Sequence, residues 1–214
     1  MTKSVWAVVV GRTGPNAKTR LGDALGPAER SALAVAMLTD VLRAASGAGL
    51  SGTIAVLDPP IAPVDGVRVV PDPGGGLDAA VTSGVRAAIE AGARTAVVLA
   101  GDLPLLEPDD ISRLVAAAES ARAVVVATDR HGTGTNALVL RPPDAIAPSF
   151  GANSGARHLA AGVAAAGGSA RSVQPHRVAL DIDTPDDLAE LVRRQPGGAT
   201  GEALRTISAV TRGR

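Results

Sequence analysis

The sequence predicts an α/β fold in which helices cover a mostly parallel β-sheet. Apolar runs of strand length alternate along the 214 residues with segments of helical periodicity. The run 96–100 has the length and branching of a strand buried on both faces, and a helical pattern begins at 108–110. Asp102 follows this strand after one glycine, in the crevice where open α/β sheets bind ligands. Taken alone, Asp102 is equally well explained as a turn or helix-capping residue.

The composition narrows the class of protein. Hydrophobic residues make up 46% of the chain, and the core must be aliphatic because Trp6 and Phe150 are the only aromatic residues. The 21 basic and 21 acidic residues balance, so no basic field and no stacking platform favour a nucleic-acid partner. The absence of cysteine excludes disulfides, thiolate metal sites and a cysteine nucleophile. The three histidines are too widely spaced to form a zinc-type pair.

The sequence also indicates where in the cell the protein is located. The first residues run straight into a strand-like segment without a signal-peptide pattern, and no apolar run approaches the roughly 20 residues that cross a bilayer. We therefore expect a soluble, cytoplasmic protein with no membrane partner.

The first third of the chain alternates strands with one long helix. Residues 5–10 form the first predicted strand, and the loop 11–20 that follows is rich in glycine and cations. Such a loop suits phosphate binding, although it is not a Walker A motif and an ordinary solvated loop is the alternative. A helix opens at 26–29 with proline in its first turn, and strands at 53–57 and 67–70 follow. The crossover between these two strands is too rich in proline for a full helix.

The segment 71–78 is the second loop of interest. Three consecutive glycines, 74–76, are costly to order, and a stable fold usually keeps such a run for close backbone approach. A helix over 77–91 follows directly, so its free N–H groups face the same crevice. The alternative is a flexible surface turn.

The next loop and helix offer further hydrogen-bond donors. Strands at 123–128 and 137–141 flank a loop in which glycines alternate with small hydroxyl residues, and these can bind an anion. His131 in this loop has no neighbour to pair with and is interpreted as a loop residue rather than a general base. Asn153 or Ser154 is a natural N-cap for a helix over 155–166.

A last short strand is predicted at 178–180, and it delivers two carboxylates. Alternation along an extended chain puts Asp181 and Asp183 on the same side. The helix that starts at Thr184 has a cap, a proline and acids in its first turn, so capping explains Asp186 and Asp187. It does not explain Asp181 and Asp183.

The chain divides near residue 195. We expect one domain over 1–195, followed over 196–214 by a linker, a short amphipathic helix at 200–210 and a basic tail at 212–214. This extension is interpreted as a packed or partner-facing segment without chemistry of its own.

Taken together, the residues at the strand ends indicate a function more specifically than any one of them does. Asp102, Asp181 and Asp183 offer the hard oxygen ligands that hold Mg²⁺ beside substrate phosphates. Nucleotidyl transfer needs mainly in-line positioning and charge neutralisation, so it fits a chain without an evident nucleophile. Four glycine-rich or cap-type loops surround the carboxylates, at 11–20, 73–77, 132–135 and 151–154.

Six segments resemble the signature segments of the phospholactate guanylyltransferase family of coenzyme F420 biosynthesis, whose bacterial members are phosphoenolpyruvate guanylyltransferases. The resemblance runs in family order from residue 5 to about residue 190. The segments are Lys18-Thr-Arg-Leu21, Asp72-Pro-Gly-Gly-Gly-Leu77, Gly101-Asp-Leu-Pro-Leu105, Gly132-Thr-Gly-Thr-Asn136, Phe150-Gly-x-x-Ser154 and Asp181-Ile-Asp-Thr-Pro185.

The resemblance implies a fold and a reaction. The fold is a single-domain, Rossmann-like three-layer sandwich of the GT-A nucleotidyltransferase type, with a mostly parallel mixed sheet. The phosphate of phosphoenolpyruvate or 2-phospho-L-lactate would attack the α-phosphorus of GTP and release pyrophosphate, with Mg²⁺ as cofactor. A homodimer is compatible with the C-terminal helix, and an unstable product would suit hand-off to the next enzyme of the pathway.

The same resemblance assigns roles to residues. The catalytic set would be Lys18, Arg20 and Asp102, and the metal ligands Asp102, Asp181 and Asp183. The acceptor carboxylate would lie on Thr135, Gly151 and Ser154. The nucleotide would contact Arg12, Lys18, Arg20, Gly75, Gly76, Leu77, Asp78 and Asp102. The family usually has lysine where Arg12 stands and asparagine where Asp78 stands; an acid at 78 could accept hydrogen bonds from the guanine N1–H and N2–H₂.

Two other classes of function compete with this interpretation. One is another nucleotidyltransferase of the same fold, with a 3-phosphoglycerate, molybdopterin or sugar-phosphate acceptor or with a cytidine nucleotide. Members of that group usually carry a Gly-Gly-x-Gly-x-Arg-Met type of first loop, which residues 11–15 do not reproduce. The other is a non-catalytic nucleotide-binding regulatory domain, which would have no need of three clustered carboxylates.

Overall fold

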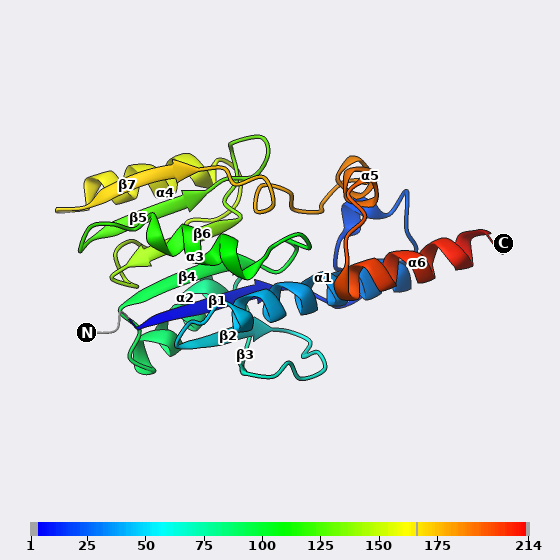
Figure 1. Cartoon of the computed structure of the whole chain (residues 1–214), viewed down its shortest axis with the longest axis horizontal. Coiled ribbons are helices and arrows are strands. Elements are labelled where there is room, and N and C mark those ends of the chain that lie inside the picture. The colour runs from blue at the N-terminus through cyan, green and yellow to red at the C-terminus, as the bar shows by residue number, and fades with distance from the viewer. Residues whose placement is uncertain (1–3, 166, 213–214) are drawn as a thin grey trace.

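A twisted seven-stranded sheet forms the middle of the molecule in this computed structural model, which describes residues 4–165 and 167–212 (Figure 1). The strand order is β3-β2-β1-β4-β6-β5-β7. The strands are β1 (Val5–Gly11), β2 (Gly52–Leu57), β3 (Val67–Pro71), β4 (Thr95–Ala100), β5 (Ala123–Ala127), β6 (Ala137–Arg141) and β7 (Ser169–Val173). The helices are η1 (Thr19–Leu21), α1 (Pro27–Gly47), α2 (Leu77–Glu90), α3 (Pro108–Ala116), α4 (Ser154–Ala164), α5 (Pro185–Arg193) and α6 (Gly198–Arg212).

The sheet is mixed, with β6 as its antiparallel strand. β1 pairs in parallel with both β2 and β4, and β2 pairs in parallel with β3. β6 runs antiparallel to its neighbours β4 and β5, while β5 and β7 are parallel. The predicted α/β class and the mostly parallel mixed sheet are confirmed.

Helices cover both faces of the sheet and make it a three-layer sandwich. Side chains alternate along each strand, so Ala7 and Val9 of β1 pack toward α1 and α3, whereas Val8 and Val10 pack toward α2. Leu159 of α4 packs against the same apolar cluster as Val8 and Val10. Figure 1 shows α2 beside β1 and β2, and α4 beside β5 and β7.

A third, smaller apolar cluster lies beyond the edge of the sandwich and supports the loops around the strand ends. It joins η1, α1, α5 and α6, and its buried members are Leu21, Leu25, Leu33, Met37, Leu180, Ile182, Leu191 and Ile207. The Asp40 carboxylate of α1 accepts hydrogen bonds from the N–H groups of Ala199 (2.9 Å) and Thr200 (2.8 Å). These bonds cap the first turn of α6, which packs along α1 (Figure 1).

The predicted elements are confirmed with shifts of at most two residues at an end, apart from three differences. The strand predicted at 178–180 is wrong, because these residues form a buried turn. The last strand is instead β7, whose alternation is obscured by its exposed serines and arginine at the edge of the sheet. Asn153 takes the N-cap position of α4 in a left-handed conformation, but its side chain makes no capping hydrogen bond.

Arg212 belongs to α6, and the rest of the predicted basic tail, 213–214, lies outside the described residues, as does residue 166 of the predicted fourth helix. Among the helices that the structure describes, none combines the length and the apolar character needed to cross a membrane.

Gly101 allows the ends of β1 and β4 to approach each other. A Cβ at this position would lie 2.9 Å from the Val10 carbonyl oxygen, 2.9 Å from Leu38 Cδ1 and 3.2 Å from the Gly11 Cα. Two of these atoms belong to the backbone of the neighbouring strand and cannot move aside. The residue before Asp102 must therefore be glycine for the carboxylate to sit beside the loop that leaves β1.

We predict that Gly101→Ala lowers the free energy of unfolding by about 1–3 kcal/mol, because the added methyl group overpacks the strand junction. Urea denaturation measures this change. Gly47→Ala is the matched control, since its Cβ would meet only Pro108 Cγ at 3.5 Å, an ordinary contact. Equal stability of the two variants would contradict the close approach.

Candidate active site

A cleft opens at the carboxyl ends of β1 and β4. Its volume is about 480 Å³, within the range of small-ligand sites. In the strand order the chain runs from β1 outward to β3 and then returns to β4 on the other side of β1, so these two strands flank the topological switch point. The loop after β1, the start of α2 and the segment after β4 form its walls.

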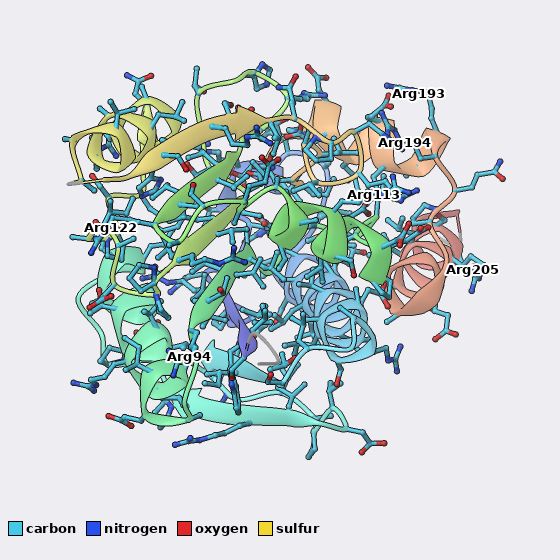
Figure 2. All side chains as sticks on the ribbon, turned by 60° about the vertical axis from the view of Figure 1, so that its left-hand side comes forward. Arg94, Arg113, Arg122, Arg193, Arg194 and Arg205 are labelled. Atoms are coloured by element: carbon cyan, nitrogen blue, oxygen red, sulfur yellow. The ribbon has the colours of Figure 1, made fainter. Side chains whose placement is uncertain are left out.

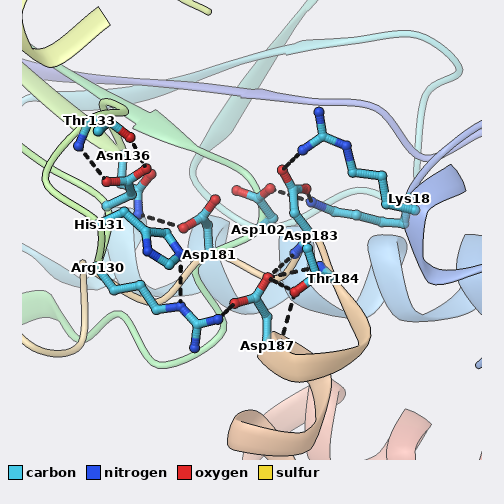
Figure 3. A network of polar contacts seen from close by, with 12 residues as sticks. Lys18, Asp102, Arg130, His131, Thr133, Asn136, Asp181, Asp183, Thr184 and Asp187 are labelled. Atoms are coloured by element: carbon cyan, nitrogen blue, oxygen red, sulfur yellow. Dashed lines mark hydrogen bonds and ion pairs between the residues drawn. The ribbon is translucent and has the colours of Figure 1, made fainter. Parts of the chain in front are cut away.

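Three carboxylates meet at one side of this cleft (Figure 3). Asp102 follows β4, while Asp181 and Asp183 lie on the irregular segment between the 176–179 turn and α5. One oxygen from each lies within 4.8 Å of the others, and all three residues are half-buried. Leu180 and Ile182, which alternate with the two later aspartates, are buried in the third apolar cluster. This packing turns both carboxylates toward Asp102.

The electrostatics of the three carboxylates are unfavourable without a cation. Burial, together with the negative charge of Asp102, raises the pKa of Asp181 to about 6. The amide of Asn136 opposes this shift, because its Nδ2 donates to Asp181 Oδ1 at 3.1 Å and to the Val178 carbonyl at 2.9 Å. Asn136 therefore orients Asp181 and supports its charged form.

Lys18 supplies a positive charge to the other two carboxylates. It sits in the left-handed conformation (φ 52°) at the start of η1, and its Nζ donates to Asp102 Oδ2 and, at 2.8 Å, to Asp183 Oδ1. Burial alone would lower the pKa of Lys18, but the two aspartates raise it above its ordinary value. The exposed Arg20 adds a longer contact, 3.8 Å, to Asp183. Lys18 is thus a fixed cation in the lining of the cleft.

Ion pairs of the surrounding elements hold the segment that carries the two later aspartates. Asp187, which is buried, accepts from Thr184 N (2.8 Å) and pairs with Arg130 at 2.7 Å (Figure 3). Arg177 binds the buried carboxylate of Asp110 with Nε at 2.7 Å and Nη2 at 3.0 Å. The first pair joins the loop before β6 to α5, and the second joins the 176–179 turn to α3. Asp187 caps α5 as predicted and also forms this ion pair.

The donor set fits a metal ion. Three carboxylates and one ammonium leave an excess of negative charge, and hard oxygen ligands in this number suit a divalent cation that keeps some of its waters. The cluster formed by Asp102, Asp181 and Asp183 can therefore hold a metal ion.

Hydroxyl groups and a buried histidine lie next to the cleft at the start of β6. Thr135 lines the cleft, and its Oγ1 lies 3.0 Å from Ser154 Oγ and 3.1 Å from His158 Nδ1. Gly151, with φ of 98°, bends the chain between Phe150 and the start of α4. The Phe150 N–H donates to Asp78 Oδ1 at 2.7 Å, which ties the start of α2 to this segment.

The structure brings together most of the residues that the sequence singles out. Gly75 and Gly76 take positive φ values of 84° and 95° in the loop before α2, as their predicted role in backbone approach requires. Six of them do not line the cleft directly: Gly75, Gly76, Asp78, Gly151, Ser154 and Asp181. The roles of all these residues stay predictions. Those that do line it are Arg12, Lys18, Arg20, Leu77, Asp102, Thr135 and Asp183.

Sequence reasoning missed three residues of this site: Asn136, Phe150 and His158. Asn136 and Phe150 lie within the segments that carry the resemblance. The sequence did not reveal the role of Asn136, because its hydrogen bond to Asp181 joins residues 45 positions apart. His158 follows Ser154 by four residues on the predicted helix, so the spacing of one helical turn was a usable signal.

The arginines labelled in Figure 2 lie on the outside of the fold. Several pair with acids of their own helices: Arg113 with Asp109 at 2.8 Å, and Arg194 with Glu190 at 2.7 Å. Exposed pairs of this kind contribute little to stability. They differ from Lys18, whose charge is directed at the cleft.

Solved structures of nucleotidyltransferases share this fold. A protein described as a nucleotide-diphospho-sugar transferase from Desulfovibrio desulfuricans superposes with a TM-score of 0.76 at 16% identity, covering 99% of this chain and 98% of its own. A 4-diphosphocytidyl-2C-methyl-D-erythritol synthase from Anaerococcus prevotii superposes with a TM-score of 0.60 at 10% identity, covering 90% and 96%. At these identities the likeness shows a shared fold.

The chain belongs to the guanylyl transferase CofC-like family, whose model matches residues 7–212. Curated relatives include phosphoenolpyruvate guanylyltransferases from Sphaerobacter thermophilus (38% identical, over 89% of this chain and 93% of the relative) and Rubrobacter xylanophilus (41%, over 88% and 93%). A 3-phospho-D-glycerate guanylyltransferase from Phenylobacterium zucineum is 36% identical over 94% and 95%. The resemblance seen in the motifs is confirmed, and the protein is an enzyme of the nucleotidyltransferase type.

We predict that buried His158 makes the fold acid-sensitive. Burial lowers its pKa from 6.5 to about 4, with Arg157 acting in the same direction and Asp78 opposing. Between these values the unfolded chain binds a proton that the folded chain does not. The free energy of unfolding therefore falls as the pH drops from 6.5 to 4, by at most about 1.4 kcal/mol per pH unit from this group.

Urea denaturation at pH 7 and pH 5 measures this loss. His158→Asn is expected to lose less stability than the wild type over the same interval. The exposed imidazole of His176 provides the control, because His176→Asn is expected to retain the wild-type difference. A His158→Asn protein with the full wild-type loss would contradict the assignment.

Proposed function

We propose that this protein transfers GMP from GTP to the phosphate group of phosphoenolpyruvate or 2-phospho-L-lactate, releases pyrophosphate, and acts in coenzyme F420 biosynthesis. The family supports guanylyl transfer, and the curated relatives named phosphoenolpyruvate guanylyltransferase support that acceptor. The observation that carries the proposal is the cluster of Asp102, Asp181 and Asp183 with Lys18 beside the switch-point cleft.

The cleft suits a triphosphate on the β1 side. Arg12, Lys18 and Arg20 bring cations to the loop that leaves β1, where the phosphates would lie. The guanosine would lie beside Gly75, Gly76 and Leu77, whose backbone and exposed apolar side chain offer a surface for the base. Asp78 remains a proposed contact of the guanine, although one of its oxygens already accepts the Phe150 N–H.

The reaction would be an in-line displacement. An oxygen of the acceptor phosphate forms a bond to the α-phosphorus of GTP, the bond from that phosphorus to the bridging oxygen breaks, and pyrophosphate leaves with the electron pair. A Mg²⁺ ion held by the three aspartates would neutralise charge that builds up on the phosphates. Lys18 and Arg20 neutralise the leaving group, and Asn136 keeps Asp181 in place. No proton has to be abstracted, because the acceptor phosphate is already an anion.

The acceptor would lie on the β6 and α4 side of the cleft. Thr135, Gly151 and Ser154 surround the position proposed for its carboxylate. 3-Phosphoglycerate is a second candidate, favoured by the relative from Phenylobacterium zucineum that is named for that substrate. The three acids differ only by a double bond, a methyl group or a hydroxyl group.

The organisation of the chain belongs to the same proposal. Residues 1–195 would form the transferase domain, and 196–214 an extension that packs through α6 on α1. A homodimer, a cytoplasmic location and hand-off of the product to the next enzyme of the pathway remain predictions from the sequence.

The first test is pyrophosphate release by the purified protein with Mg²⁺. Four nucleoside triphosphates are crossed with phosphoenolpyruvate, 2-phospholactate and 3-phosphoglycerate. We expect release with GTP and one of the acceptors alone, which also identifies the acceptor. Release of pyrophosphate with a different nucleotide would refute the proposal. So would the absence of release in every combination when the protein is folded.

The second test addresses the carboxylate cluster. Asp102→Asn is expected to lower kcat by on the order of 100-fold or more, because it removes a metal ligand and a charge, while GTP binding is largely kept. Asp186→Asn is the control: this exposed residue lies three positions after Asp183, and its side chain forms no hydrogen bond or ion pair with the described residues. Unchanged turnover of Asp102→Asn would eliminate the metal role.

A further inference from the structure

A buried chain of hydrogen bonds leads from α4 to the wall of the cleft. Ser154 and His158, one helical turn apart in α4, are 1% and 0% exposed. Both contact the hydroxyl oxygen of Thr135, which is 8% exposed and lines the cleft. The partners of each group determine which atoms donate along these hydrogen bonds. Only the proton of the Thr135 hydroxyl is left without a partner among them.

The tautomer of His158 follows from its partners. The Ser149 backbone N–H can only donate, and it lies 2.9 Å from His158 Nε2, so Nε2 is the acceptor and carries no proton. A neutral imidazole then has its proton on Nδ1. Nδ1 lies 3.1 Å from Thr135 Oγ1, and it therefore donates to this oxygen.

The hydroxyl of Ser154 supplies the second hydrogen bond to the same oxygen. Its Oγ lies 3.0 Å from Thr135 Oγ1. If Thr135 donated to Ser154 instead, the Ser154 proton would be left without an acceptor in the interior, which costs about 1–3 kcal/mol. The better arrangement has Ser154 as donor, because Thr135 faces the cleft and its own proton can reach a ligand or solvent there.

Both lone pairs of the Thr135 oxygen are then occupied, and its proton is the one group left to face the cleft. Thr135 can offer a hydrogen bond to a ligand but cannot accept one. This polarity selects an anionic oxygen and disfavours a donor such as an amide or hydroxyl proton.

We propose that His158 is a positioning residue that holds the Thr135 hydroxyl as a hydrogen-bond donor toward an anionic oxygen of the acceptor substrate. The assignment of that oxygen to the acceptor rests on the proposed function. Thr135 comes just before β6, and β4 separates β6 from β1, whose following loop carries Arg12 and Lys18. His158 itself touches no substrate in this arrangement.

The first test reads the tautomer directly and needs no activity. Long-range ¹H–¹⁵N spectra of the histidine-labelled protein at pH 7 are expected to show one imidazole protonated only at Nδ1, and this signal disappears in His158→Asn. An Nε2–H tautomer or an imidazolium at His158 would overturn the proposal. The result stands even if the protein transfers no GMP, so it separates this inference from the proposed function.

The second test measures acceptor binding in four variants. His158→Leu and Thr135→Val are each expected to raise the KM for the acceptor about 10- to 100-fold, with the KM for GTP unchanged. His158→Asn is expected to restore most of the affinity, because its amide can donate from near the Nδ1 position, and Thr135→Ser is expected to keep it. If the protein has no turnover, calorimetric binding of phosphoenolpyruvate replaces KM.

The double variant distinguishes positioning from a general structural role. In a Thr135→Val background His158 has no hydroxyl to orient, so adding His158→Leu is expected to leave the acceptor KM as it is. Independent, multiplying effects of the two substitutions would refute the proposal, as would a rise in the KM for GTP with an unchanged acceptor KM. His176→Asn is the control variant, because it removes an exposed imidazole that forms no described hydrogen bond with Thr135.

Discussion

The close approach of three carboxylates is the constraint on which the rest of this structure depends. Their nearest oxygens lie within 4.8 Å of one another, and two unit charges at that separation repel by about 3 kcal/mol at an effective dielectric constant near 20. The fold overcomes this repulsion in two ways. Lys18 places an ammonium group between Asp102 and Asp183, and buried Leu180 and Ile182 hold the later aspartates in position. A binding cation is then favoured because it relieves charge that packing has already concentrated.

Unusual backbone conformations flank the same cleft. Lys18 and Asn153 are two of the three non-glycine residues with positive φ among those the structure describes, at 52° and 56°. Such conformations cost about 1–3 kcal/mol each and persist where the surrounding structure enforces them, often at functional sites. Here one of them aims the Lys18 ammonium at the carboxylates, and the other starts α4 so that Ser154 and His158 face Thr135.

The sheet is common to many nucleotidyltransferases, so the specificity of this one must reside in its loops. Neighbours at 10% and 16% identity retain the architecture. The β1 side of the cleft offers cations and glycine backbone, which suit a nucleotide. The β6 and α4 side offers hydroxyl donors, which suit a small oxyanion. The hydrogen bond from Phe150 N–H to Asp78 joins the two sides and fixes their relative position.

The sequence by itself determined the α/β class, most element boundaries and the three carboxylates, because buried strands, glycine-rich loops and strand-end aspartates are local patterns. Alternation placed Asp181 and Asp183 on one side correctly although 178–180 forms no strand, because Leu180 and Ile182 are buried and alternate with the two half-buried aspartates. Only the tertiary structure decided that Lys18 bridges Asp102 and Asp183, that Asn136 supports Asp181, and that His158 contacts Thr135. The physical reason is that each of these contacts joins residues 23 or more positions apart, and sequence pattern carries no information on which distant side chains will share a buried polar site.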